Sequence, residues 1–242
     1  MQIRAILLDF GDTVVLADQF DYDACLRKLH RSLARDAVKV PYKDFKEIYF
    51  EVRGRLYRET EETLREAHFC IRISETLRHF GYSLKPTDPL IIRAADAFGE
   101  AFVQHIRMEK CVPTILKQLH SNYLLGLVSN FAYSPALRKT LERFDITKFF
   151  DAIIISGEVG WRKPSSKIFQ KALDALSASA SETVFVGDML HMDIEGAKRM
   201  GMKTVLVKET VERPELLEEI EKVKPQWIIS KLDELQKILQ NI

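Results

Sequence analysis

The sequence predicts an α/β fold, namely a doubly wound parallel sheet with an inserted all-helical domain. Between about Asp18 and Met108, apolar residues recur every three or four positions, which is typical of amphipathic helices. Before and after this region, short apolar runs of the buried-strand type alternate with helical segments. Such alternation indicates a parallel sheet covered by helices on both faces. The 242 residues are enough for this core and one smaller inserted domain.

The predicted sheet begins with residues 3–8 (IRAILL), a short and mostly apolar run. Five later runs are similarly short and apolar, at residues 123–128, 152–155, 183–186, 204–207 and 227–229. Because these runs flank the helical region on both sides, we expect residues 1–16 and 109–242 to form one Rossmann-like core. In sheets of this kind, ligands bind at the carboxyl ends of the strands.

Residues 17–108 predict the inserted domain. Its apolar positions repeat with helical spacing in four stretches: Tyr22, Leu26, Leu29 and Leu33; Phe45, Ile48, Val52 and Leu56; Phe69, Ile73, Leu77 and Phe80; Ile91, Ala94, Phe98, Phe102 and Ile106. Breaks are expected near Val40-Pro41 and within 58–66 and 81–89. We therefore expect a small domain of four helices that resembles a four-helix bundle, with hinges at residues 13–17 and 108–113.

The composition narrows the class of partner. A net charge of +1, from 36 basic and 35 acidic residues, argues against a nucleic acid or a membrane as the main partner. No stretch approaches the ~18 apolar residues of a membrane span. The three cysteines, Cys25, Cys70 and Cys111, have no CxxC spacing and fit free thiols in a reducing compartment. We expect a cytoplasmic protein.

Polar side chains follow the predicted strands. Taken singly, each has an ordinary interpretation as a cap, a turn residue or a solvated helix-start residue. Together they would meet at one edge of the sheet, which predicts a site there. These residues are Asp9, Ser129, Asn130, Lys163, Asp188 and Asp193.

The same residues resemble the four motifs of the haloacid dehalogenase-like hydrolase superfamily. DFGDT approximates the first motif, DxDx[TV], and LLGLVSN matches the second, an apolar strand that ends in Ser or Thr. RKP matches the third motif, and GDMLHMD matches the fourth, GDxxxxD. The matching segments extend over the whole predicted core. The helical insertion lies between the first and second motifs, where the phosphatase-type subgroup with a helical cap carries its cap.

The resemblance implies a phosphatase that works through a covalent aspartyl-phosphate. Asp9 would be the nucleophile. Ser129 and Lys163 would contribute to catalysis by binding the phosphoryl group, with Asn130 as a further phosphate contact. The expected substrate is a small phosphate ester, such as a sugar, polyol or triose phosphate. The cap would close over it during phosphoryl transfer.

The resemblance also implies a Mg²⁺ site. Asp9, Asp188 and the backbone carbonyl of Gly11 would be its ligands, since Mg²⁺ prefers oxygen. Asp193 and Thr13 would lie one layer behind these ligands and orient them or Lys163.

One residue departs from the family pattern. The first motif normally has a second aspartate two positions after the nucleophile, which serves as the general acid and base, and here that position is Gly11. Asp12 is the available substitute, because a glycine at position 11 could let the backbone turn its side chain inward. Alternatively, Asp12 only hydrogen-bonds its own turn.

Two other readings of the site stay open. Family members without this aspartate include enzymes that cleave carbon–halogen bonds, although these need no metal and the complete GDxxxxD motif argues against them. Others cleave carbon–phosphorus bonds with a lysine of the cap, and Lys28, Lys39, Lys43 and Lys46 are available there. A catalytically weakened binding protein on this fold is the alternative from another class.

The predicted cap is rich in arginine. These side chains could recognise an anionic end of the substrate, but their helical spacing from glutamates favours a solvated ion-pair surface. They are Arg53, Arg55, Arg58, Arg65, Arg72 and Arg78.

Overall fold

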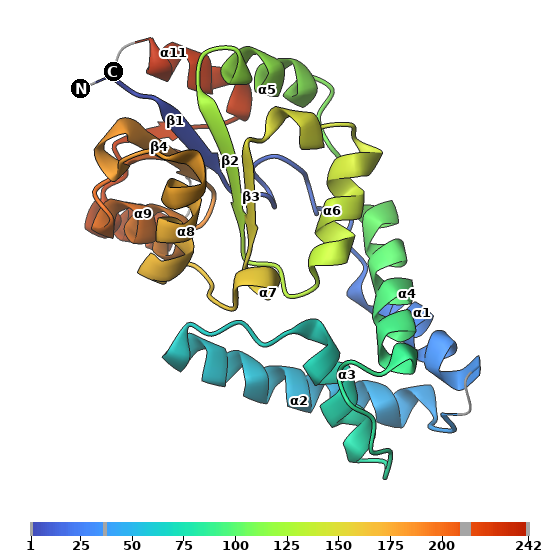
Figure 1. The fold of residues 1–242 in the computed structure, drawn as a ribbon. Coiled ribbons are helices and arrows are strands. Elements are labelled where there is room, and N and C mark those ends of the chain that lie inside the picture. The colour runs from blue at the N-terminus through green and yellow to red at the C-terminus, as the bar shows by residue number, and fades with distance from the viewer. Residues whose placement is uncertain (1, 36–37, 209–213, 241–242) are drawn as a thin grey trace.

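The computed structural model describes residues 2–35, 38–208 and 214–240. Within them, six strands form one parallel sheet in the order β3-β2-β1-β4-β5-β6 (Figure 1). The strands are β1 (Ala5–Leu8), β2 (Leu124–Ser129), β3 (Ala152–Ile155), β4 (Thr183–Gly187), β5 (Lys203–Val207) and β6 (Trp227–Ile229). The chain adds strands outward from β1 to β3, then crosses back and continues from β4 to β6. The predicted doubly wound parallel sheet is therefore confirmed, and its order reverses beside β1.

Helices cover both faces of this sheet. The core helices are α5 (Val112–His120), α6 (Ser134–Arg143), α7 (Ser156–Val159), α8 (Ser166–Leu176), α9 (Glu195–Arg199), α10 (Pro214–Val223) and α11 (Leu235–Leu239). Alternate residues of β1 determine which layer each side chain joins. Leu7 packs with apolar side chains of α8 and α9, whereas Ile6 and Leu8 pack with those of α5, α6 and α11. All are fully buried, as expected of a central parallel strand.

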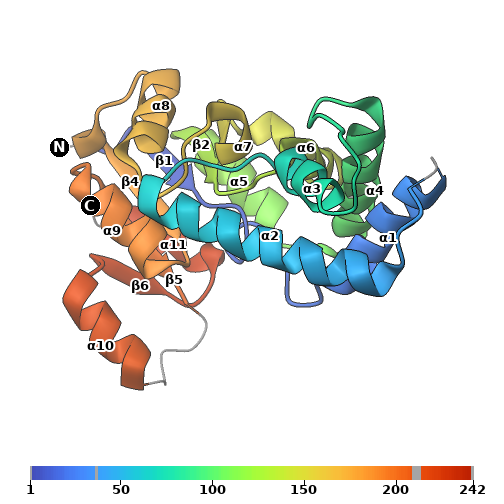
Figure 2. The ribbon, with the colours of Figure 1, turned by 90° about the horizontal axis from the view of Figure 1, so that it is seen from below.

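The inserted helices are α1 (Tyr22–Arg35), α2 (Tyr42–Thr63), α3 (Phe69–Arg78) and α4 (Pro89–His105). They occupy the segments predicted from periodicity, and the breaks between them fall where Pro41, the charged run and Pro89 indicated. In Figure 1, α2 and α3 lie below the carboxyl ends of the strands, and in Figure 2, which is seen from below, they lie in front of the core. The inserted all-helical cap is thus confirmed, while the domain boundaries at residues 16–17 and 108–109 stay a prediction.

The two chain crossings into the cap lie side by side. Leu16 and Arg107 exchange backbone hydrogen bonds of 2.8 and 3.1 Å, and Arg107 also forms an ion pair with Asp18. Leu16 lies within the first segment predicted as a hinge, and Arg107 directly precedes the second. The two chain segments that lead into and out of the cap are therefore hydrogen-bonded to each other.

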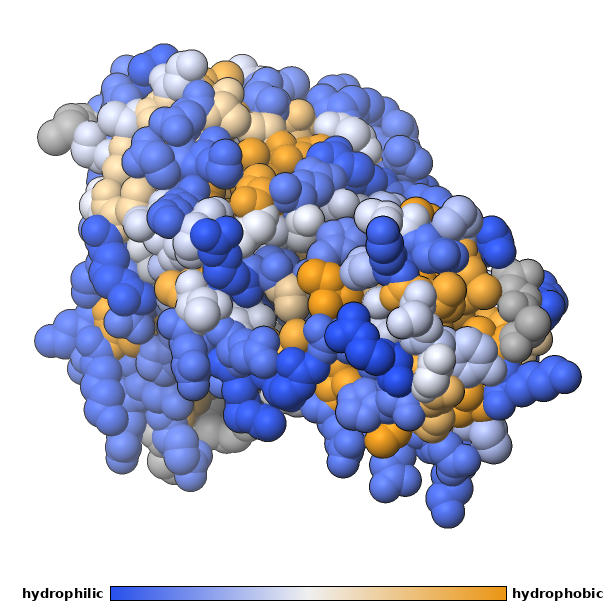
Figure 3. All heavy atoms as spheres, turned by 60° about the horizontal axis from the view of Figure 1, so that its bottom comes forward, coloured by the Kyte–Doolittle hydropathy of each residue, from blue (hydrophilic) through white to orange (hydrophobic). Residues whose placement is uncertain are grey.

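The surface on the cap side is mainly hydrophilic, with hydrophobic side chains in small patches between charged ones (Figure 3). The exposed large hydrophobic residues of the cap are Phe50, Tyr57 and Ile92. Among the helices in the described ranges, none combines the length and apolar character that crossing a membrane requires.

Candidate active site

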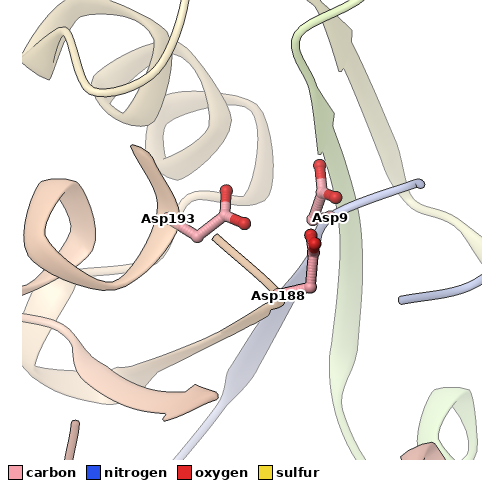
Figure 4. Close-up of side chains that lie close together, drawn as sticks. All are labelled: Asp9, Asp188 and Asp193. Atoms are coloured by element: carbon pink, nitrogen blue, oxygen red, sulfur yellow. The ribbon is translucent and has the colours of Figure 1, made fainter. Parts of the chain in front are cut away.

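Three adjacent strands bring their polar ends together. Asp9 follows β1, Ser129 ends β2, and Asp188 follows β4. Because β1 lies between β2 and β4, these side chains come together at the point where the strand order reverses. Figure 4 shows the carboxyl groups of Asp9 and Asp188 at neighbouring strand ends, with Asp193 beside them. The convergence predicted from the sequence is therefore present.

Lys163 joins the acidic groups. Its Nζ forms ion pairs with Asp9 and, at 2.6 Å, with Asp193, and it donates to the carbonyl of Val128 at 2.9 Å. The side chain is buried, and burial alone would lower the pKa of the ammonium. The negative charges of Asp193 and Asp9 outweigh this effect and raise the pKa of Lys163. The lysine is therefore held as a cation.

The carboxyl groups of Asp9 and Asp188 are harder to ionise than usual. Burial raises the pKa of Asp9 to about 6, although the charge of Lys163 counteracts this rise. Burial, followed by the charges of Asp9 and Asp193, raises the pKa of Asp188 to about 7. Three carboxylates and a single buried ammonium leave an excess of negative charge, which a bound cation would relieve.

The acidic groups fit a Mg²⁺ ion. One oxygen from each of Asp9, Asp188 and Asp193 lies within 4.8 Å of the others, and carboxylates are the ligands that Mg²⁺ prefers. Asp193 already uses both oxygens, since Oδ1 pairs with Lys163 and Oδ2 accepts the amide of Met189 at 3.0 Å. Asp9 and Asp188 are therefore better placed as ligands, and Asp193 is better placed to orient Lys163.

Asp193 reaches this position through a local feature of the chain. It lies in η3 (Leu190–Ile194), a single π-helical turn that follows β4 after Asp188 and Met189. Its carboxylate lies against Gly187, where any Cβ would overlap it. The glycine of the fourth motif is thus required by close packing rather than by backbone conformation.

Asn130 and Ser129 have different surroundings. The Asn130 side chain accepts the amide of Lys163 at 2.7 Å and donates to its carbonyl at 3.0 Å. These two bonds fix the backbone that carries the lysine. Ser129 is buried and lines the same pocket as Asp9. Direct phosphate contacts by either residue stay predictions.

The first-motif loop differs from expectation in where its left-handed residue lies. Asp12, not Gly11, has the positive φ of 52°. The Asp12 amide donates to the carbonyl of Val15 at 2.7 Å, and its Oδ1 accepts the amide of Ala17 at 3.2 Å. Asp12 therefore stabilises its own turn, while it also lines the pocket beside Asp9. Its acid/base role stays a prediction.

Thr13 follows in the same loop. It is buried, and its Oγ1 has no hydrogen-bond partner among the described residues. The predicted role behind the metal ligands also stays a prediction.

The pocket is small and lies under the cap. Its volume is about 230 Å³, and its wall includes Phe102 and Ile106 at the end of the cap as well as Asp9, Lys163 and Asp188. A pocket of this size has room for a small metabolite.

Sequence reasoning missed Lys208. This residue follows β5, donates from Nζ to the carbonyl of Asp188 at 3.3 Å, and partly offsets the rise in the pKa of the Asp188 carboxyl. The strand-end rule that identified Asp9 would have identified it, but no motif included it.

Comparison with known proteins agrees with this geometry. Residues 36–207 match the family model described as haloacid dehalogenase-like hydrolase. The protein belongs to this family, and the predicted resemblance is confirmed.

Curated relatives of similar length are named phosphatases. The glyceraldehyde 3-phosphate phosphatase of Pyrococcus abyssi is 32% identical over 212 residues, which cover 85% of this chain and 82% of the relative. The enzyme of the same name from Methanopyrus kandleri is 29% identical, covering 85% and 84%. The ribulose-1,5-bisphosphate 5-phosphatase of Halopiger xanaduensis is 28% identical, covering 84% and 83%.

Solved structures share the fold. A HAD phosphatase from Thermococcus onnurineus has a TM-score of 0.68 at 22% identity, covering 98% of each chain. A 2-haloacid dehalogenase from Pseudomonas syringae has a TM-score of 0.70 at 22% identity, covering 99% of each chain. At this identity, the likeness concerns the fold alone.

Proposed function

We propose that this protein is a Mg²⁺-dependent phosphatase that hydrolyses a small phosphorylated metabolite through an aspartyl-phosphate on Asp9. The observation that carries the proposal is the buried Asp9–Lys163–Asp193 chain of ion pairs beside Asp188. A carboxylate next to a fixed cation can approach a phosphate dianion, which a lone carboxylate would repel. The names of the curated relatives support the same reaction.

In the first step, a carboxylate oxygen of Asp9 bonds to phosphorus. The bond from phosphorus to the ester oxygen breaks, and the electron pair leaves with that oxygen, which takes a proton. In the second step, a water oxygen bonds to phosphorus, and the bond to Asp9 breaks. Inorganic phosphate leaves, and the Asp9 carboxylate is restored.

The protein groups keep charge in balance through both steps. Lys163 holds its positive charge against Asp9, and Asp193 keeps the ammonium in place. Ser129 would donate a hydrogen bond to a phosphoryl oxygen. Mg²⁺ held by Asp9, Asp188 and the Gly11 carbonyl would supply further positive charge against the phosphate.

Asp12 is our candidate for the proton transfers. As a carboxylic acid it would protonate the leaving oxygen, and as a carboxylate it would take the proton from water. Its Oδ1 bonds to the amide of Ala17, and this turn keeps the carboxyl beside the pocket. If Asp12 serves the turn alone, water must supply these protons, and good leaving groups would be favoured.

The substrate class follows from the pocket and the relatives. A volume of about 230 Å³ fits a small phosphate ester. The named activities of the relatives concern a triose phosphate and a pentose bisphosphate, which support a sugar phosphate here.

The free thiols of Cys25, Cys70 and Cys111 support the predicted cytoplasmic location.

The alternative activities have less support. Among the described residues, none of the cap lysines considered for carbon–phosphorus cleavage lines the pocket. The acidic cluster that fits a cation has no purpose in metal-free carbon–halogen cleavage. Only a measurement of turnover distinguishes a phosphatase from a catalytically weakened binding protein on the same fold.

The test is hydrolysis of an aryl phosphate with and without Mg²⁺, between about pH 5 and 9. We expect metal-dependent turnover that Asp9→Asn abolishes. No metal-dependent turnover by the wild-type protein would contradict the proposal. Asp12→Asn is the second arm. Full activity of Asp12→Asn on aryl and alkyl phosphates would remove Asp12 as the acid/base.

A further inference from the structure

Arg72 is a half-buried cation of the cap. It lies on α3, and its Nη1 donates to the hydroxyls of Tyr22 at 3.1 Å and Tyr49 at 3.4 Å. These two hydroxyls are themselves 2.8 Å apart. The guanidinium carbon lies 5.4 Å from the centre of the Phe69 ring and 5.8 Å from that of Tyr49. Its neighbours are thus phenols and aromatic rings.

This cation has no counter-charge among the described residues. Burial raises the pKa of Tyr49 well above its usual value, so the phenol is neutral. The Nε of Arg72 is buried without a hydrogen-bond partner in the same part of the chain. Shielding a cation from water without a counter-charge is costly, and neutral hydroxyls and rings offset this cost only in part, so the site favours an anion.

Other cap arginines behave differently. Arg55 pairs with Glu59 at 2.9 Å and with Glu75, which is the ion-pair surface expected from the sequence. The Arg65 guanidinium lies 4.1 Å above the ring of Trp161 on the core. Arg72 thus differs from Arg55 in having no acidic partner, and from Arg65 in combining its ring contacts with hydrogen bonds to two hydroxyls.

Arg72 lines a second pocket next to the catalytic one. This pocket has a volume of about 240 Å³ and includes Arg53, whose guanidinium lies 4.8 Å from the centre of the Tyr22 ring. The second pocket shares Phe102, Asn130 and Phe131 with the catalytic pocket. A substrate whose phosphoryl group lies at Asp9 can therefore extend between cap and core toward Arg72.

We propose that Arg72, assisted by Arg53, binds a second anionic group of the substrate, at the end opposite the transferred phosphoryl group. The group is a carboxylate or a second phosphate, because a guanidinium binds either through paired N–H donors. The aromatic walls exclude water and strengthen that contact. This inference rests on the proposed phosphatase function and narrows its substrate class to phosphate esters with two anionic ends.

The test uses three phosphate esters with the same carbon chain, which ends in a carboxylate, a second phosphate or a neutral hydroxymethyl group. We expect the wild-type protein to prefer one or both anionic esters in kcat/KM. Arg72→Gln should reduce that preference by about 10- to 100-fold, mainly through KM, since a charge-assisted hydrogen bond is lost. The carboxylate and phosphate arms identify which anion is bound.

Two further variants keep the test decisive. Arg55→Gln removes an exposed cap arginine with its own acidic partners and should leave both the rate and the preference unchanged. Arg72→Lys keeps the charge but loses the paired donors, and it should retain part of the preference. It also replaces Arg72→Gln if the latter does not fold.

The outcomes separate this inference from the proposed function. Turnover of aryl phosphate without any preference for anionic esters would overturn the inference alone. An equal loss of kcat/KM for all three esters in folded Arg72→Gln would also overturn it, since Arg72 would then be structural. Absence of all Mg²⁺-dependent turnover in the wild-type protein would overturn the proposed function.

Discussion

At the residue scale, position 11 is open to a side chain. A Cβ built on Gly11 would meet no atom within 4 Å, and the residue does not have the left-handed φ that favours glycine. Glycine is therefore not required there by space or backbone strain. The space above it belongs to the catalytic pocket, which Gly11 lines beside Asp9.

This geometry predicts a gain of function. Gly11→Asp should fold normally. It should raise kcat for an alkyl phosphate by at least about tenfold, because one carboxylate oxygen of Asp12 is engaged by the amide of Ala17 and a well-positioned acid/base contributes roughly 10²–10⁴. The measurement is kcat on an alkyl phosphate and an aryl phosphate at saturating Mg²⁺. Gly11→Asn is the matched control, with the same shape and no proton to transfer. Equal rates for the Asp and Asn variants would contradict the prediction.

The raised pKa of Asp188 predicts a pH-dependent stability in the absence of metal. Between pH 3.8 and about 7, this carboxyl is protonated in the folded chain and ionised in the unfolded chain, so the free energy of unfolding falls as the pH rises. The contribution is about 2–4 kcal/mol. Asp9, with a pKa of about 6, acts in the same direction.

The measurement is thermal unfolding from about pH 4 to 8 in EDTA and in Mg²⁺. We expect the midpoint in EDTA to fall as the pH rises from about 4 to about 7, Mg²⁺ to restore it, and Asp188→Asn to flatten the curve. Identical curves with and without Mg²⁺ would show that the acidic cluster holds no cation.

At the element scale, residues 64–68 connect the cap to the core. This segment, which we call the docking loop, lies between α2 and α3. The carbonyl of Leu64 accepts the amide of Arg162 at 3.1 Å. The amide of Glu66 donates to the carbonyl of Gly160 at 3.2 Å. Glu66 Oε2 also accepts the hydroxyl of Ser156 at 2.7 Å. These contacts hold the cap over the strand ends.

Removal of one contact should weaken closure. Ser156 links Glu66 to the pocket, since its Oγ also accepts the amide of Phe131 at 2.8 Å. We expect Glu66→Ala to raise KM by about 3- to 10-fold, as befits the loss of one hydrogen bond to a charged group. Glu66→Gln keeps an acceptor and should lie close to the wild-type protein. Unchanged KM in Glu66→Ala would mean that the docking loop does not contribute to closure.

The elements themselves were predictable from the sequence. The apolar runs of β1 to β6 and the helical spacing of α1 to α4 identify every strand and cap helix, because burial imposes those periods. The docking loop was not predictable. Its partners Ser156 and Gly160 lie about 90 residues away, and no local pattern encodes such a contact.

The site was predictable to the same degree. Asp9, Lys163, Asp188 and Asp193 follow from strand ends and motif spacing. The two hydrogen bonds between the Asn130 side chain and the Lys163 backbone could not be predicted, because they depend on how two distant loops pack together. The sequence also does not show that Arg72 lacks an acidic partner, because its position in a helical pattern resembles that of Arg55, which pairs with Glu59.

At the scale of the whole molecule, an aromatic cluster joins cap and core. Phe69 lies 4.8 Å from Phe98 of the cap and 5.5 Å from Tyr133 of the core, and Phe102 lies 4.9 Å from Phe131, measured between ring centres. One apolar cluster continues from α1 and α4 to the sheet. We infer that cap and core unfold together.

Phe69→Ala should therefore destabilise the whole chain. We expect a loss of about 3–5 kcal/mol in the free energy of unfolding, with a single transition. Denaturant unfolding followed by far-UV circular dichroism and by tryptophan fluorescence measures this. Ile92→Ala, at a 41% exposed position on α4, is the control and should change stability by less than about 1 kcal/mol. Two separate transitions would show that cap and core are independent.

The most direct test of the central claim is to trap the phosphoryl group on Asp9. The protein is mixed with an aryl phosphate and Mg²⁺, quenched in acid within the first turnover, digested and analysed by mass spectrometry. We expect a phosphate mass on the peptide that carries Asp9, and none in Asp9→Asn or without Mg²⁺. Hydrolysis that proceeds with no phosphorylated Asp9 peptide, or that persists in Asp9→Asn, would contradict the account.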